Sequence, residues 1–320
     1  MCTAISYISG DHYFGRNLDL EHSFGESVIV TPRAYRFDFR CGTVISKHYA
    51  IIGIGIVEDG YPLYYDGVNE MGLCMAGLNF VGFAKYNGNG RDRIAPFEFL
   101  PWVLGQCDSV ARARERLGHL ALTETDFSPE LPAARLHWII ADRHDCITVE
   151  SLESGLRIHD NPAGVLTNDP PFDDQMFQLT NFMHLSPRPP HNHFSDTLEL
   201  KPYSRGMGAM GLPGDLSSQS RFVRATFHKL NSVCTDTNAV SQFFHILGSV
   251  NQTRGCCRLE DGSFEHTLYT SCCNASRGIY HYTTYGCRRI TAVNMGRENL
   301  DGNGLIRYPL VTGEDILLQN

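Results

Sequence analysis

The order of strand-like and helix-like segments constrains the fold of this 320-residue chain more than any other feature. Blocks of short strands, read from alternating and β-branched runs bounded by turn residues, come between pairs of helices. Strands are predicted at residues 3–8, 12–16, 27–31, 49–57, 63–66, 72–80, 136–141, 146–151, 163–167, 266–271, 279–284 and 289–295. Because the strands come in hairpin blocks, this order favours an α+β fold with antiparallel sheets between helical layers over a wheel of βαβ units.

Helix signals separate the strand blocks. Pro96 stands at a first-turn position of one helix, and Asp108 is predicted to cap a second helix over residues 109–120. Further helices are predicted at 173–184, 219–230 and 237–247, and a proline-rich loop spans 184–220. Loops of that length are commonly functional or disordered. The sequence has no fixed-period repeat and no low-complexity linker, so we expect one domain over residues 1–320.

Composition and charge exclude several classes of protein. The chain is 42% hydrophobic and 19% charged, as in an ordinary globular protein, and its net charge is −8. It therefore has no overall positive field to attract nucleic acid or an anionic membrane. The longest apolar run, residues 50–57, is far shorter than the about 20 residues that span a bilayer. The start of the chain lacks the basic and apolar regions of a secretion signal, so the eleven cysteines are expected to be reduced thiols of a cytoplasmic protein.

The second residue, Cys2, carries the strongest chemical signal. If Met1 is removed, the same residue holds a thiol and a free α-amine, so a nucleophile and a base share one Cα. Unperturbed thiols titrate near ~8.5 and α-amines near ~8, so a small environmental shift makes such a pair reactive at neutral pH. The alternative is an inert cysteine in a frayed terminus, or a small buried hydrophobe.

A predicted hairpin returns two charged residues to Cys2. Arg16 and Asp19 follow the turn at residues 9–11. An arginine beside a thiol favours the thiolate, and an aspartate beside an α-amine holds and orients it. The alternative is a surface ion pair of little energetic weight.

Other motifs are interpreted as structural. The G-x-G-x-x-G string at 206–211 follows no strand and precedes Pro213, which argues against a dinucleotide site. The cysteine doublets at 256–257 and 272–273 lack the spacing of a zinc site, so buried thiols are expected there. The two histidines at 191–193 lie among prolines, in what we interpret as a surface turn.

Five short blocks together carry a family resemblance. They are Met1-Cys2-Thr3, Phe14-Gly15-Arg16-Asn17-Leu18-Asp19, Gly77-Leu78-Asn79-Phe80, Leu166-Thr167-Asn168 and Ser218-Gln219-Ser220-Arg221-Phe222-Val223-Arg224. In this order and spacing, from Cys2 to about Tyr285, they resemble the choloylglycine hydrolase family of N-terminal nucleophile hydrolases. Within that family, which also contains penicillin V acylases, the chain is more similar to the bile salt hydrolases.

The resemblance implies roles for the residues around the terminus. Cys2 would be the nucleophile after removal of Met1, with its own α-amine as base and later as proton donor. Arg16 would lie near the sulfur, Asp19 would hold the amine, and Arg221 would complete the polar network.

The resemblance also implies an oxyanion hole, made by the backbone N–H of Asn79 and the side-chain amide of Asn168. Each donor of this kind is worth about 3 kcal/mol of the barrier, because the tetrahedral intermediate carries its charge there. The implied fold is a four-layer αββα sandwich, in agreement with the alternation of strands and helices. The implied assembly is a homotetramer or a homodimer, and no metal or other cofactor is needed.

The implied reaction is hydrolysis of the amide that links a bile acid to glycine or taurine, through a thioester on Cys2. Asn79 favours this activity over the alternative, penicillin V acylase, since tyrosine often stands at that position in penicillin V acylases. The conjugated bile salt needs an apolar pocket for its steroid. The sequence nominates five side chains for that pocket, which are Leu20, Phe24, Tyr64, Phe127 and Leu131.

Arg205 is expected to influence the choice of leaving group. The block Tyr203-Ser204-Arg205-Gly206 resembles a selectivity loop that favours glycine conjugates, because a cation near the anion of the leaving group forms a charge-assisted pair. A noncatalytic steroid or lipid carrier would share the pocket but would not need a free Cys2. A papain-like cysteine protease would need its cysteine in a Cys-Gly-Ser-Cys-Trp context, which this sequence lacks.

Overall fold

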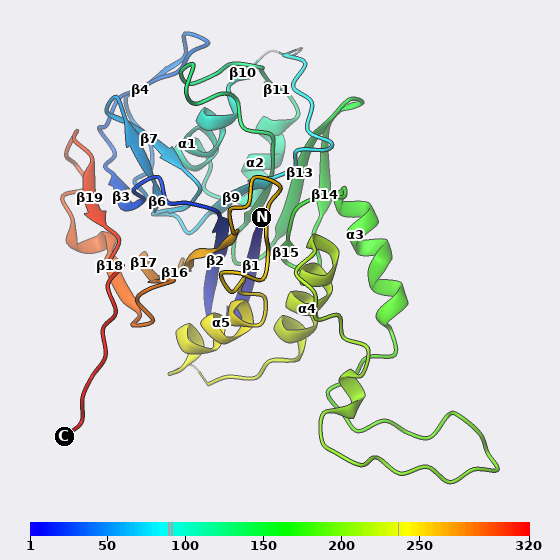
Figure 1. The fold of residues 1–320 in the computed structure, drawn as a ribbon. Coiled ribbons are helices and arrows are strands. Elements are labelled where there is room, and N and C mark those ends of the chain that lie inside the picture. The colour runs from blue at the N-terminus through cyan, green and yellow to red at the C-terminus, as the bar shows by residue number, and fades with distance from the viewer. Residues whose placement is uncertain (89, 91, 236) are drawn as a thin grey trace.

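Two antiparallel sheets stacked face to face lie between helical layers in the part of the chain that the structure describes (Figure 1). The structure is a computed structural model that describes residues 1–320 except 89, 91 and 236. Apolar side chains from both sheets share one core, so the sheets pack directly on each other. The predicted α+β class and four-layer αββα order are therefore confirmed.

The small sheet begins with the N-terminal hairpin. Its order is β15 (Val165–Leu166), β1 (Cys2–Ser9), β2 (Asp11–Leu20), β16 (His266–Asn274), β17 (Ile279–Thr284) and β18 (Thr291–Asn294). β1 pairs with β2 along its whole length, from Cys2 opposite Leu18 to Ser9 opposite Asp11. Gly10, in the turn, has a φ of 66°, a left-handed conformation that glycine adopts without strain. The hairpin therefore fixes Cys2 within the sheet.

The central strands of the large sheet are buried on both faces. Its order is β14 (Gly155–Asp160), β13 (Cys146–Leu152), β12 (Leu136–Ala141), β9 (Cys74–Asn79), β8 (Asp66–Asn69), β6 (Ile51–Glu58), β3 (Ser27–Thr31) and β19 (Ile306–Pro309), with β7 (Tyr61–Tyr64) paired to β6. In β6, Ile52 and Ile54 lie in the core between the sheets, whereas Ile51 lies in the core on the outer face. Because the side chains on both faces of β6 are buried, its sequence is a continuous apolar run and does not alternate between apolar and polar residues.

Short strand pairs and helices complete the layers. The pairs are β4 (Phe37–Asp38) with β5 (Val44–Ile45), and β10 (Asp92–Ile94) with β11 (Leu120–Leu122). The helices are α1 (Pro96–Gln106), α2 (Val110–Leu117), α3 (Phe172–Gln178), α4 (Ser218–Asn231) and α5 (Ala239–Gly248), with 3-10 turns η1 (Leu179–Phe182), η2 (Met207–Ala209) and η3 (Met295–Arg297).

The helices divide between the two sheets. α1 and α2 pack on the large sheet around Trp138. α4 and α5 pack on the small sheet, where Phe222 and Phe243 join the core that the two sheets share. Among the described residues, no helix has both the length and the apolar character needed to cross a membrane.

Several predicted elements differ from the structure. Ser109 caps α2, since its Oγ accepts a hydrogen bond from the backbone N–H of Arg112 at 3.3 Å, so the prediction of Asp108 was wrong. The helix predicted at 173–184 ends at Gln178 and continues as a 3-10 turn. β14 and β19 were not predicted, because each is a short strand at an edge of the sheet and its residues are only partly buried or exposed.

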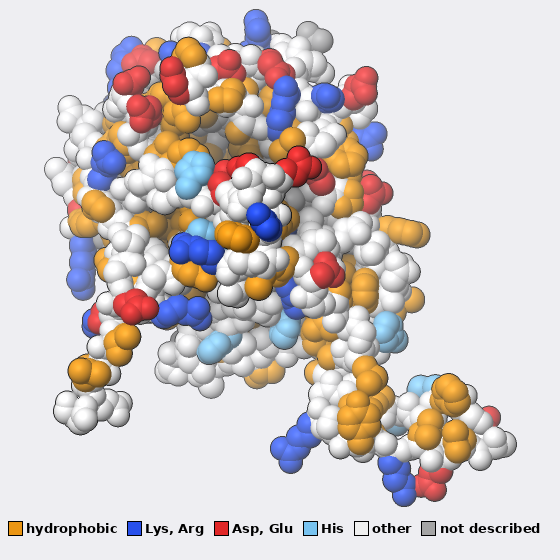
Figure 2. All heavy atoms as spheres, in the orientation of Figure 1, with side chains coloured by type: hydrophobic (Ala, Val, Ile, Leu, Met, Phe, Trp, Pro, Cys, Tyr) orange, Lys and Arg blue, Asp and Glu red, His pale blue; other side chains and the backbone are white. Residues whose placement is uncertain are grey.

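Residues 183–213, which we call the projecting segment, extend away from the sheets (Figure 1). They include η2 and most of the proline-rich loop predicted from the sequence. Figure 2 shows apolar side chains gathered on this projection. The exposed ones are Met183, Phe194, Leu198, Leu200, Tyr203 and Met210. Contiguous exposed apolar side chains are typical of an interaction surface.

Candidate active site

Cys2 opens strand β1, and its side chain is only 2% exposed. Met1 continues the hairpin beyond it. The α-amine of Met1 donates to the carbonyl oxygen of Asp19 at 2.7 Å, and the N–H of Asp19 donates to the carbonyl oxygen of Met1 at 2.9 Å. The terminus is therefore held as an additional antiparallel pair of β1 and β2 and is not frayed.

A buried arginine from α4 holds the backbone of Cys2. Arg221 Nη1 donates to the carbonyl oxygen of Cys2 and to Thr3 Oγ1, the latter at 2.7 Å. Arg221 Nη2 donates to Asn168 Oδ1 at 2.7 Å, and the N–H of Cys2 donates to the same oxygen at 2.8 Å. Burial lowers the pKa of Arg221, while the nearby charge of Asp19 opposes that shift. Segments far apart in the sequence thus meet at Cys2.

Arg16 places a second guanidinium beside Cys2, on the neighbouring strand β2. Its side chain is buried, and Nη1 donates to the carbonyl oxygens of Tyr65 at 3.0 Å and Gly77 at 2.5 Å. Burial alone would lower the pKa of Arg16, but the acidic groups around it, Cys2 foremost, outweigh burial and raise that pKa. The guanidinium is therefore a fixed cation at the thiol.

Asp19 contacts the terminus through its backbone rather than its carboxylate. Its Oδ1 accepts from Thr267 Oγ1 at 2.6 Å, and its Oδ2 accepts from Gln252 Nε2 at 3.2 Å. With Met1 attached, the α-amine donates to the carbonyl oxygen of Asp19. The predicted contact between the Asp19 carboxylate and an amine on Cys2 concerns the chain without Met1.

Asn79 and Asn168 meet next to Cys2. Asn168 Nδ2 donates to the carbonyl oxygen of Asn79 at 2.9 Å. The N–H of Phe80 donates to the carbonyl oxygen of Arg135, just before β12, so the N–H of Asn79 points to the opposite side of β9, where the N–H of Gly77 donates to the carbonyl oxygen of Tyr65. That side faces Arg16, which donates to the carbonyl oxygen of Tyr65. An amide NH₂ has two hydrogens, so Asn168 Nδ2 retains a second donor.

An apolar cavity of about 250 Å³ adjoins these residues. Cys2, Arg16 and Asn79 form the polar part of its wall. The cavity is also lined by every side chain nominated for the steroid pocket: Leu20, Phe24, Tyr64, Phe127 and Leu131. A mainly apolar hollow with a few polar groups is the usual form of a small-molecule site.

Helix α1 contributes lining residues that the sequence interpretation missed. Phe97 and Leu100 face the cavity together with Trp138 of β12. The rings of Phe97 and Phe127 meet edge to face, with centroids 5.2 Å apart. The sequence signal for these lining residues was the nearly continuous apolar composition of α1. That composition is equally typical of a helix that packs only against its sheet and lines no cavity.

Arg205 lies apart from the other predicted site residues. It is exposed on the projecting segment and does not line the cavity beside Cys2. The segment leaves the body of the protein after η1, which carries Arg205 away from the ends of the strands (Figure 1). Within one chain, Arg205 therefore does not lie near the cavity in which the leaving group is expected.

Asp66 of β8 is a further buried acid near Arg16 that the sequence did not single out. It accepts hydrogen bonds from Tyr269 Oη at 3.1 Å and from Tyr280 Oη. Burial raises the pKa of Asp66, and the charge of Arg16 opposes this shift. Its partners come from β16 and β17, so no local sequence pattern indicates the cluster.

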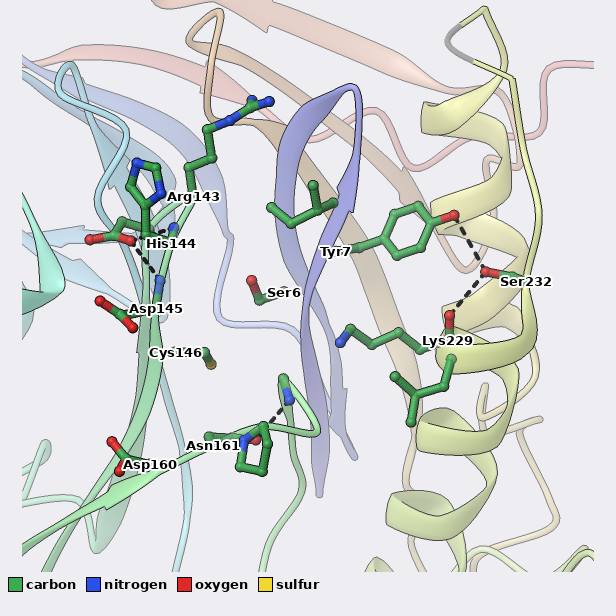
Figure 3. A pocket seen from close by; sticks show the side chains of 15 residues that line it. Ser6, Tyr7, Arg143, His144, Asp145, Cys146, Asp160, Asn161, Lys229 and Ser232 are labelled. Carbon is green, nitrogen blue, oxygen red and sulfur yellow. Dashed lines mark hydrogen bonds between the residues drawn. The ribbon is translucent and has the colours of Figure 1, made fainter.

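A wider hollow of about 620 Å³ lies near the other end of β1 (Figure 3). Its lining mixes acidic and basic side chains, among them Arg143 and Lys229. Lys229 Nζ donates to the carbonyl oxygen of Ala163 at 2.7 Å, and burial lowers its pKa. Neither Cys2 nor its partners line this hollow. The candidate active site is therefore the smaller apolar cavity, which Cys2 lines.

Sequence comparison relates the chain to known proteins. Residues 2–308 match the linear amide C–N hydrolases of the choloylglycine hydrolase family. A bile salt hydrolase/transferase of Lactiplantibacillus plantarum is 52% identical over 314 residues, which is 97% of each chain. A bile salt hydrolase/transferase of Clostridium perfringens is 37% identical over 321 residues, which is 96% of each chain.

Solved structures show the same relationship. The fold matches a cysteine-to-alanine mutant of the conjugated bile acid hydrolase from Clostridium perfringens with a TM-score of 0.93, 35% identity and 100% coverage of both chains. A penicillin V acylase from Agrobacterium tumefaciens shares the fold, with a TM-score of 0.75 and 18% identity over 96% of this chain and 90% of that one. From its fold and from the sequence match over nearly its whole length, the chain belongs to the choloylglycine hydrolase family of linear amide C–N hydrolases.

Proposed function

We propose that this protein hydrolyses the amide bond of glycine- or taurine-conjugated bile salts, with the thiol of Cys2 as nucleophile once Met1 has been removed. One observation carries the proposal: the thiol lies in the wall of an apolar cavity, beside the fixed guanidinium of Arg16. A rigid apolar steroid with a polar amide at one end suits such a cavity. The names of the similar proteins support the same substrate class.

The first step is attack by sulfur on the amide carbonyl. The thiol proton passes to the α-amine of Cys2 as the S–C bond forms. The carbonyl oxygen becomes an oxyanion, which the N–H of Asn79 and the free N–H of Asn168 Nδ2 stabilise. Preorganised donors of this kind are each worth about 3 kcal/mol, because they need no reorganisation as the charge develops.

The intermediate then collapses to a thioester. The C–N bond breaks, and the proton held by the α-amine passes to the leaving nitrogen, so that glycine or taurine departs as an amine. Water next attacks the thioester and gives a proton to the α-amine. Cleavage of the C–S bond releases the free bile acid, and return of the proton to sulfur restores the thiol.

The two arginines have different parts in this scheme. Arg16 favours the thiolate through its charge, since a nearby cation stabilises the ionised sulfur. Arg221 acts on geometry, because it bonds both the carbonyl oxygen of Cys2 and the Oδ1 of Asn168. Asp19 holds the α-amine once that amine belongs to Cys2.

The leaving-group preference is proposed to depend on assembly. The projecting segment carries Arg205 together with exposed apolar side chains, so we propose that it packs against another copy in a homodimer or homotetramer. A preference for glycine conjugates through Arg205 then requires this segment to approach the cavity of a neighbouring copy. We propose the cytoplasm as the location, because the chain has eleven cysteines and all of them are free thiols in the structure.

An amine in place of water would convert hydrolysis into acyl transfer at the same thioester. The hydrolase/transferase names of two similar proteins favour this second reaction. It uses the same nucleophile and the same oxyanion hole, and differs only in the group that attacks the thioester.

The proposal is tested by the release of glycine from glycocholate by protein whose mass shows that Met1 is absent. Release should vanish in a Cys2→Ala variant that still folds. A noncatalytic carrier would bind the bile salt equally in both proteins and release nothing. If processed, folded protein releases no glycine or taurine, the proposal fails and penicillin V becomes the next substrate to try.

A further inference from the structure

A buried carboxylate contacts the N-terminal amine of the chain. Glu265 stands immediately before β16, and its Oε1 forms an ion pair with the α-amine of Met1. The side chain of Glu265 is only 9% exposed. The segment that leads into β16, golden in Figure 1, passes around the N-terminus. The backbone N–H of Glu265 donates to the carbonyl oxygen of Cys257 at 2.9 Å, which holds the main chain of Glu265 beside the terminus.

Removal of Met1 brings the terminal amine one residue inward. Two consecutive backbone nitrogens in an extended chain are about 3.5 Å apart by covalent geometry. The α-amine of Cys2 therefore lies within about 6 Å of the Glu265 carboxylate if the backbone stays where it is. The ammonium of Met1 is then gone, and the carboxylate remains buried near the new amine.

We propose that Glu265 is a positioning residue that holds the α-amine of Cys2 in the processed protein. This inference rests on the proposed function, in which that amine is the base. An ionised carboxylate without a partner in a buried place is costly, so a neighbouring ammonium is its natural counter-ion. The same contact would direct the amine and keep it beside the thiol.

Asp19 is the other carboxylate proposed to hold the amine, and Glu265 acts in addition to it. The carboxylate of Asp19 already accepts from Thr267 and Gln252. Arg16 and Arg221 are cations, so both oppose an ammonium. Cys257, in the segment before β16, interacts electrostatically with both the N-terminal amine and Glu265. The thiol of Cys2 itself is a further ionisable group beside the amine.

Burial and the N-terminal amine shift the pKa of Glu265 in opposite directions. Burial raises the pKa of Glu265, and the N-terminal ammonium lowers it in part. Conversely, a carboxylate beside the amine and thiol favours their protonated forms. Replacing Glu265 by a neutral amide should therefore move both limbs of the pH–rate profile to lower pH.

The experiment compares kcat/KM for glycocholate against pH in the processed wild type, Glu265→Gln and Glu265→Asp. At about 6 Å and an effective dielectric constant of about 20–40, removing the Glu265 charge should shift each limb of the pH–rate profile by about one pH unit or more. Glu265→Gln should show that shift, whereas Glu265→Asp should keep the wild-type profile because it retains the charge. Glu70→Gln is the matched control, since Glu70 is paired with Arg33 away from the cavity. The control profile should match the wild type.

A second measurement does not depend on turnover. The rate at which iodoacetamide alkylates Cys2, followed by mass spectrometry of the N-terminal peptide, reports thiolate formation at each pH. Glu265→Gln should move this profile to lower pH as well. If both profiles of folded Glu265→Gln coincide with the wild type, Glu265 does not hold the amine and the inference is wrong. Failure of the proposed function itself would show differently, either as glycine release that persists in Cys2→Ala or as processed, folded wild type that releases neither glycine nor taurine.

Discussion

The side-chain amide of Asn168 donates a hydrogen bond of 2.9 Å to the backbone carbonyl of Asn79, which joins the two residues proposed to form the oxyanion hole. The same Asn168 side chain accepts from the N–H of Cys2 through its Oδ1. One amide therefore sets the position of the nucleophile relative to both donors. A small shift of Asn168 would disturb all three groups.

Asn168→Ala should lower kcat about 10²–10³-fold, because one preorganised oxyanion donor is lost. KM should change much less, since Asn168 does not line the apolar cavity. Steady-state kinetics on glycocholate provide the measurement. Asn161→Ala is a matched control, because Asn161 is a buried amide that bonds Thr148 and Val165 instead. The control should lower Tm without this loss of kcat, and an unchanged kcat in folded Asn168→Ala would contradict the assignment.

Phe127→Ala should weaken binding of the steroid. Phe127 lines the cavity and packs edge to face on Phe97. Loss of its apolar contact area should raise KM about tenfold, at about 25 cal/mol per Å² of surface no longer buried, with a smaller effect on kcat. Phe177→Ala removes a phenylalanine that is 74% exposed on α3 and should leave KM unchanged. Equal KM values for Phe127→Ala and wild type would place the steroid elsewhere.

His12 should make the fold less stable in acid. Burial lowers the pKa of His12 to about 4, whereas an unfolded histidine titrates near ~6.5. The unfolded state therefore binds the proton more tightly, and the free energy of unfolding falls as pH decreases from about 6.5 to about 4, by about 3 kcal/mol in total. Urea unfolding at pH 7 and pH 5 should show a smaller loss for His12→Gln than for wild type. Equal losses would mean that His12 is not the group that titrates.

Gly164→Ala should destabilise the protein. Gly164 has a φ of 59°, and a Cβ there would lie 2.7 Å from Lys229 Nζ and 3.1 Å from the carbonyl oxygen of Ser6. A left-handed residue with a side chain should cost about 1–3 kcal/mol of unfolding free energy. Gly214→Ala is the control, because a Cβ at Gly214 meets nothing within 4 Å. A Tm for Gly164→Ala equal to that of the control would contradict the steric need for glycine at this position.

Local patterns predicted much of the fold. The hairpin of β1 and β2 follows from apolar runs on either side of Gly10, and it places Arg16 beside Cys2 without any further information. Strands whose pairing partners lie far away in the sequence were harder to predict. β19 returns to β3 from the far end of the chain, and its four mostly exposed residues are too few to give an apolar period.

Local patterns likewise predicted the part of the candidate site that lies near Cys2 in the sequence or in short motifs, but not the part that depends on distant segments. Cys2, Arg16 and Asn79 do line one cavity with the five nominated apolar side chains. Glu265 and Asp66 were missed, since each is a single acid whose role depends on partners from other strands or from the terminus. Arg205 was nominated on its resemblance to a selectivity loop, which cannot specify how far the projecting segment extends from the sheets.

The central claim is that a thioester forms on Cys2, and rapid acid quenching during glycocholate turnover tests it most directly. Mass spectrometry after trypsin digestion should show the peptide from Cys2 to Arg16 heavier by one cholyl group. Pretreatment with iodoacetamide should remove this species and replace it with the alkylated peptide. The account would be contradicted if, during active turnover, the acyl group were found on a different cysteine or if the trapped peptide still carried Met1.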